Sequence, residues 1–131
     1  MKILIVDDLF ENRKLLRDLL AHEEACDMVS NGTDALELFE AAIFEDSPYD
    51  LVLLDIMMPG MDGQEVLKEI RTREASYDLS GENEAVIIMV TAASSPRDVL
   101  DAFFKGGCTD YIEKPFSKET LFGKLRECRL M

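Results

Sequence analysis

Short apolar runs alternate with segments of helical periodicity along the whole chain. Five runs rich in branched aliphatic residues predict strands, and the segments between them place apolar residues three and four positions apart, as helices do. Strands that alternate with helices predict an α/β fold, with one doubly wound, five-stranded parallel sheet and five helices on its two faces. The predicted strands are residues 2–6, 26–29, 50–54, 85–90 and 109–113.

Polar residues at the ends of the apolar stripes predict where the helices begin. Asp8 predicts the N-cap of the first helix, with Glu11 as its capping-box partner, and Thr33 predicts the cap of a second helix that runs to about Phe44. The remaining expectations are a helix over residues 64–73, a polar loop over 74–84, a helix that Ser95 caps and Gly106 and Gly107 end, and a last helix that Ser117 caps.

Length and composition narrow the classes of protein that this chain can be. At 131 residues, 47% of them hydrophobic, we expect one domain over residues 1–131, with its own core and no output domain. The formal net charge of -13 argues against direct binding to nucleic acid or to an anionic membrane, because phosphates are bound by clustered Lys and Arg. No apolar stretch approaches the ~20 residues of a membrane span. Three cysteines without a CxxC pattern and the lack of a targeting segment predict reduced thiols and a cytoplasmic location.

Four of the predicted strands end in residues that can handle a phosphoryl group. Asp7 and Asp8 follow the first strand, Asp55 the third, Thr91 the fourth and Lys114 the fifth. Ligands of open α/β sheets bind at the carboxyl ends of the strands, so we expect these side chains to converge there. Each residue alone also fits a structural role, as a solvated acid, a turn residue or a surface lysine. Their combination at equivalent strand ends favours one site.

The three carboxylates predict a divalent cation, because ionised acids in one crevice repel each other unless a cation lies between them. Carboxylate oxygens with room for water favour Mg²⁺. Asp55 is the candidate nucleophile, Lys114 can neutralise phosphoryl oxygens, and the hydroxyl of Thr91 can donate to one of them. A cis bond between Lys114 and Pro115 would aim the lysine into the crevice. His22, the only histidine, has no companion for metal binding.

Four stretches carry most of these residues, namely 3–8 (ILIVDD), 51–63 (LVLLDIMMPGMDG), 90–92 (VTA) and 110–116 (DYIEKPF). In this order and approximate spacing, the chain resembles the response-regulator receiver domains of two-component signalling. The resemblance covers nearly the whole chain. It implies a flavodoxin-like sheet with strand order 2-1-3-4-5, a topology for which a chemotaxis receiver is a known example.

The resemblance also implies a role for each site residue. Asp55 would accept a phosphoryl group from a histidine kinase or a histidine-phosphotransfer protein. Thr91 and Lys114 would contact this group, and Thr91 with Tyr111 would form a coupled switch that changes the surface presented to a downstream protein effector. Mg²⁺ would be held by three carboxylates and one backbone carbonyl, those of Asp7, Asp8, Asp55 and Met57.

The resulting expectation is a phosphorylation-activated receiver domain that signals in trans and catalyses only its own phosphorylation and dephosphorylation. Residues 7–16 (DDLFENRKLL) resemble receivers attached to hybrid kinases, so a receiver excised from a larger protein is an open alternative. A Mg²⁺-dependent phosphatase with an aspartyl nucleophile is less favoured, because Met57, two residues after Asp55, cannot act as a general acid. A non-phosphorylated binding module is disfavoured by the complete set of Asp8, Asp55, Thr91 and Lys114.

Two departures and one substitution pattern refine the resemblance. The exit of the second helix at residues 45–48 and the loop at 74–84 are longer than is usual for the family, and both lie away from the motifs. Met57 and Ala93 occupy the positions from which side chains in this family influence the attacking water. Because neither side chain hydrogen-bonds water strongly, we predict slow self-dephosphorylation.

Overall fold

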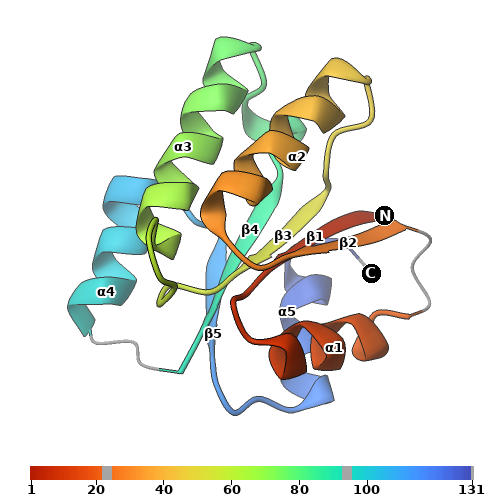
Figure 1. The fold of residues 1–131 in the computed structure, drawn as a ribbon, viewed down its shortest axis with the longest axis vertical. Coiled ribbons are helices and arrows are strands. Elements are labelled where there is room, and N and C mark those ends of the chain that lie inside the picture. Colours follow the sequence, from red (N-terminus) through yellow and green to blue (C-terminus); the bar gives the residue numbers. More distant parts are fainter. Residues whose placement is uncertain (22–24, 93–95, 131) are drawn as a thin grey trace.

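Five parallel strands form one sheet in the computed structural model, which describes residues 1–21, 25–92 and 96–130, apart from the side chain of Phe104. The strand order is β2-β1-β3-β4-β5, which confirms the predicted topology (Figure 1). The strands are β1 (Lys2–Val6), β2 (Ala25–Val29), β3 (Leu51–Leu54), β4 (Val86–Thr91) and β5 (Asp110–Glu113). Each lies within two residues of its predicted bounds, because an apolar run buried on both faces of a parallel sheet is a strong local signal.

Helices cover both faces of the sheet (Figure 1). One face carries α1 (Phe10–Leu19) and α5 (Lys118–Glu127), which share a core cluster with alternate residues of the strands. The other face carries α2 (Gly32–Phe44), α3 (Gly63–Ser76) and α4 (Pro96–Asp101), the last continued by the π-helical turn η2 (Ala102–Gly106). A short 3₁₀ turn, η1 (Gly81–Asn83), precedes β4. No helix among the described residues combines the length and the apolar character that a bilayer crossing requires.

Two predicted helix caps are wrong. Asp8 does not cap α1, whose N-cap is Leu9, without a side-chain cap bond. The acid at position 7 instead turns back at the end of β1, where its carboxylate accepts from the main-chain N–H of Leu9 at 2.9 Å. Thr33 does not cap α2, because Asn31 already accepts the N–H of Asp34 at 2.8 Å and the helix begins one residue before Thr33.

Other helix ends agree with the sequence. Ser117 caps α5 by accepting the N–H of Thr120, and Gly107, with φ at 77°, follows the last turn of η2 as the left-handed residue that ends the helix. The predicted end of α2 at Phe44 is confirmed. Ser95, the expected cap of α4, and His22 lie outside the described residues.

The predicted loop at residues 74–84 is also corrected, because α3 continues through Ser76. Glu74 is 2% exposed and packs inside the fold. Its carboxylate accepts from Arg71 Nη1 at 2.7 Å and from the main-chain N–H of Ala85 at 2.7 Å. A polar composition suggested a loop here, but a buried acid with both oxygens bonded is compatible with a packed helix end.

Candidate functional site

Neighbouring strands bring two of the acids together. Val6 at the end of β1 pairs with Leu54 at the end of β3, and the ladder continues with a 3.0 Å bond from the N–H of Asp55 to the carbonyl of Val6. The residues that follow, Asp7 and Asp55, are 2% and 6% exposed. With Asp8 they form a cluster in which one carboxylate oxygen of each lies within 4.8 Å of the others. The expected convergence of the three acids is confirmed.

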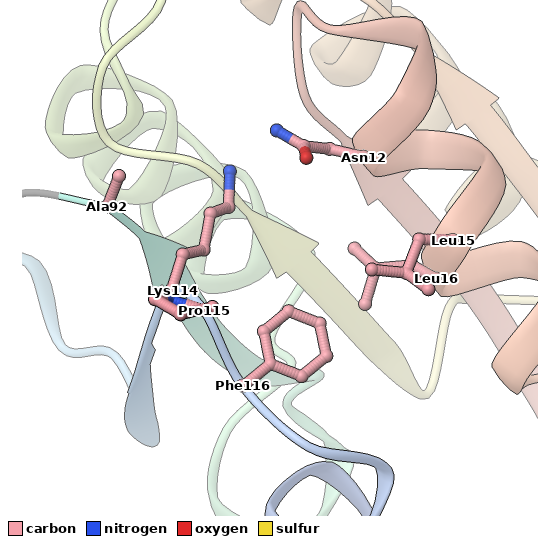
Figure 2. A pocket seen from close by; sticks show the side chains of 7 residues that line it. All are labelled: Asn12, Leu15, Leu16, Ala92, Lys114, Pro115 and Phe116. Atoms are coloured by element: carbon pink, nitrogen blue, oxygen red, sulfur yellow. The ribbon is translucent and has the colours of Figure 1, made fainter.

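The fifth strand adds the cation. The main-chain N–H of Lys114 donates to the carbonyl of Thr91 at 2.8 Å, which extends the pairing of β5 with β4. The ammonium of Lys114 then lies 2.8 Å from Asp7 Oδ2 and 3.5 Å from Asp55 Oδ2. The bond from Lys114 to Pro115 is cis, the isomer considered from the sequence. Figure 2 shows the lysine side chain among the residues that line a pocket, with its ammonium end directed toward Asn12 of α1.

The surroundings of Asp55 disfavour its ionised form. Burial raises the pKa of its carboxyl, and the neighbouring charges of Asp7 and Asp8 raise this pKa further. Lys114 and the N–H of Met57, 3.3 Å from Asp55 Oδ1, act in the opposite direction without cancelling the shift. When the three carboxyl groups are ionised, the single ammonium of Lys114 does not balance their negative charge.

The shortage of positive charge beside the three acids indicates that they fit a metal ion. Three carboxylate oxygens within 4.8 Å of one another, close to the ammonium of Lys114, are a hard donor set of the kind that Mg²⁺ prefers. The residues therefore fit Mg²⁺, which Asp7, Asp8 and Asp55 would hold. The part assigned to the Met57 carbonyl remains a prediction; the Met57 side chain is 63% exposed.

Thr91 and Tyr111 lie on adjacent strands close to this edge. Thr91, the last residue of β4, is fully buried, and its hydroxyl has no hydrogen-bond partner among the described residues. Tyr111 of β5 pairs with Met89, which precedes Thr91 by two residues on β4. The half-buried ring of Tyr111 meets the ring of Phe103 edge-on, with ring centroids 6.3 Å apart. Their coupling as a switch remains a prediction. Ala93 lies outside the described residues.

Sequence reasoning missed two residues that shape the site. A Cβ added to Gly63 would lie 2.1 Å from the carbonyl oxygen of Asp55, so the first turn of α3 can pack here only with glycine. The signal that could have identified Gly63 is its place directly after Asp62, which is the N-cap of α3. Arg13 donates from Nη1 to the main-chain carbonyl of Asp7 at 2.7 Å. The helix after Asp7 and Asp8 carries a basic residue near its start, and this pattern could have identified Arg13.

The sequence model of the response regulator receiver domain matches residues 3–126. The chain belongs to this family. Receiver domains of two-component systems bind Mg²⁺ at an acidic pocket and interact with histidine kinases and phosphotransfer proteins.

Three relatives illustrate the family. The transcriptional regulatory protein ResD of Bacillus subtilis is 42% identical over 117 residues, which are 88% of this chain and 42% of ResD, so the chain spans about two fifths of that protein. The response regulator TrrA of Thermotoga maritima, solved in complex with Mg²⁺-BeF, is 36% identical with a TM-score of 0.73, covering 97% of this chain and 98% of TrrA. The receiver domain of Ssk1 of Saccharomyces cerevisiae, solved with the histidine phosphotransfer protein Ypd1, is 27% identical with a TM-score of 0.78, covering 97% of this chain and 87% of that one.

Proposed function

We propose that this receiver domain is a phosphorylation-controlled switch that accepts a phosphoryl group on Asp55. The observation that carries the proposal is the position of the Asp55 carboxylate, beside two further acids and 3.5 Å from the ammonium of Lys114. A receiver that served only as a binding scaffold would have no use for this costly concentration of buried charge.

The reaction transfers phosphorus from nitrogen to oxygen. A carboxylate oxygen of Asp55 attacks the phosphorus of a phosphohistidine, the bond from phosphorus to the imidazole nitrogen breaks, and the nitrogen keeps the electron pair. Mg²⁺ held by the acids would supply positive charge to the phosphoryl oxygens. Lys114 contributes a second cation, and the preformed position of its ammonium lowers the cost of charge neutralisation.

The response to the phosphoryl group begins at Thr91. Its buried hydroxyl has no partner among the described residues, so a phosphoryl oxygen brought within reach would gain a hydrogen bond that the resting state lacks. Movement of Thr91 toward that oxygen would change the space beside β5, and Tyr111 with its neighbour Phe103 would repack. The altered surface would signal to a downstream protein effector in trans.

A pocket beside Lys114 supports the proposed partner, a helical histidine kinase or phosphotransfer protein. The pocket has a volume of about 270 Å³ and lies between α1 and the segment after β5 (Figure 2). Its lining is Asn12, Leu15, Leu16, Ala92, Lys114, Pro115 and Phe116. Leu15 is among the exposed large apolar side chains of the structure, as are Leu9 and Phe10 at the start of α1. A helix docked on this surface would bring its phosphohistidine to the acids, and the Ssk1 receiver is a relative solved with such a protein.

Two further expectations belong to the same proposal. Catalysis is limited to the chain's own phosphorylation and dephosphorylation, since Met57 offers no general acid for turnover of phosphate esters. The three free cysteines support a cytoplasmic location, where thiols stay reduced.

The test is phosphorylation by a small donor. The chain is incubated with acetyl phosphate and Mg²⁺ and its intact mass is measured. We expect one phosphoryl adduct, lost in Asp55→Asn and retained in the matched control Asp62→Asn, which makes the same charge change nearby and keeps a capping side chain. An adduct that survives in Asp55→Asn would contradict the proposal. Multiple turnover of a generic phosphate ester would favour the phosphatase alternative instead.

A further inference from the structure

The start of α1 is held by a residue of its own second turn. The N-cap residue Leu9 makes no side-chain cap bond, although the first turn of a helix leaves main-chain N–H groups without helical partners. The chain is instead tied just before the helix, where Arg13 Nη1 donates to the carbonyl of Asp7 at 2.7 Å. A hydrogen bond from a guanidinium to a carbonyl is charge-assisted and stronger than a neutral one.

This bond acts on the link between the two N-terminal acids. The carbonyl of Asp7 belongs to the peptide group that joins Asp7 to Asp8, so Arg13 fixes the plane of that group. The orientation of the plane determines how the two carboxylates are placed relative to each other. The other bonds of Asp7 do not involve this carbonyl. Its N–H donates to the carbonyl of Val29 at 3.2 Å, and its carboxylate accepts from the N–H of Leu9, from Asn12 Nδ2 at 3.5 Å and from Lys114.

Arg13 is itself held in place. Its side chain is half-buried, and its guanidinium carbon lies 5.9 Å from the centroid of the Phe10 ring, three residues earlier on the same helix. A guanidinium over an aromatic face gains a cation–π attraction and loses freedom to leave the site. The donor is therefore in position before any ligand binds.

We propose that Arg13 is a positioning residue of the Mg²⁺ site, a role that rests on the metal site of the proposed function. Arg13 would favour Mg²⁺ binding through the hydrogen bond that orients the Asp7 carbonyl, whereas its positive charge would oppose binding. The two contributions have opposite signs. As a positive charge near the cation, Arg13 weakens Mg²⁺ binding, so its removal would tighten binding if charge were all that mattered. As a positioning group it strengthens binding, so its removal must weaken it.

The test is calorimetric titration of the whole chain with Mg²⁺, with circular dichroism to verify the fold. We expect Arg13→Met to bind Mg²⁺ roughly tenfold more weakly, as is usual when a group that orients metal ligands is lost. Arg17→Met is the matched control, since it removes the same charge one turn later on α1 from an exposed position, and its affinity should equal or exceed that of the wild type.

A second variant separates charge from geometry and serves if Arg13→Met does not fold. Arg13→Lys keeps the charge but shortens and re-aims the donor, so we expect an affinity between those of the wild type and Arg13→Met. Wild-type affinity in Arg13→Lys, or equal or tighter binding by a folded Arg13→Met, would overturn the positioning role alone. Failure of the wild type to bind Mg²⁺ would overturn the proposed site and this role with it.

Discussion

Lys114 and Asp7 form a 2.8 Å ion pair across 107 residues of sequence. The same ammonium is 3.5 Å from Asp55, so Lys114 lies closer to an expected metal ligand than to the expected phosphoacceptor. Mg²⁺ would therefore compete with Lys114 for the Asp7 carboxylate, and a phosphoryl group on Asp55 would attract the displaced ammonium.

Lys114→Met should change metal binding and phosphorylation in opposite directions. Removal of the ammonium frees Asp7 and removes a repulsive charge, so Mg²⁺ should bind roughly tenfold tighter, which corresponds to about 1.4 kcal/mol. Phosphorylation by acetyl phosphate should slow about 100-fold, because one of the groups that neutralise the transferred phosphoryl oxygens is lost. Titration calorimetry and the rate of adduct formation measure the two effects. Weaker Mg²⁺ binding in Lys114→Met would contradict this interpretation.

Asp55→Asn should raise the melting temperature of the metal-free protein at neutral pH. Since the pKa of this carboxyl is raised in the folded state, the folded chain keeps the proton to higher pH than the unfolded chain does, and ionisation of Asp55 then opposes folding. The stability that protonation confers is present below the ordinary pKa of an aspartate and is lost as the pH rises through the raised value. The advantage of Asp55→Asn over the wild type should therefore grow across that window and shrink in acid.

The control for this prediction is Glu37→Gln, which removes one negative charge from an exposed position of α2. Thermal unfolding at a series of pH values without divalent cations measures the difference between each variant and the wild type. An equal gain for both variants would mean that the net charge of -13 is responsible rather than the site.

Gly63→Ala and Gly123→Ala should have opposite effects on stability. The added Cβ at position 63 would overlap the carbonyl of Asp55, so we expect a loss of roughly 1–3 kcal/mol and a displaced acceptor. Gly123 lies inside α5 with no atom within 4 Å of an added Cβ, so alanine there should stabilise by about 0.5–1 kcal/mol through helix propensity. Urea unfolding measures both, and a neutral Gly63→Ala would show that the loop at Asp55 can relax.

Met57→Asn/Ala93→Glu should shorten the lifetime of the phosphorylated state. The two native side chains do not hydrogen-bond water strongly, whereas the polar pair can orient an attacking water, with a gain of up to about 100-fold. A phosphate-release time course on the phosphorylated protein measures the rate. Met57→Leu is the control and should keep the wild-type rate. Equal release by the double variant and the wild type would defeat the hypothesis.

Local signals explain which elements could be predicted. A strand that is buried on both faces of a parallel sheet is a short apolar run, which can be identified without knowing its neighbours in the fold. All five strands could therefore be located from the sequence. The cap of α2 was missed because two polar residues, Asn31 and Thr33, stand at its start and the backbone selects the first. The cap of α1 was missed because the helix begins after Leu9, without any side-chain cap. The packed end of α3 was missed because the carboxylate of Glu74 finds its main-chain partner 11 residues away, at Ala85.

The sequence alone determined the alternation of strands and helices and the kinds of residue that stand where the strands end, which is why fold class and candidate acids could be predicted together. Tertiary structure decided what those residues touch. The order of the strands in the sheet brought Lys114 to Asp7. The packing of α1 and α3 on the two faces of the sheet placed Arg13 at the carbonyl of Asp7 and Gly63 at the carbonyl of Asp55. Contacts of this kind depend on the register between segments far apart along the chain, and the pattern of any one segment does not contain that register.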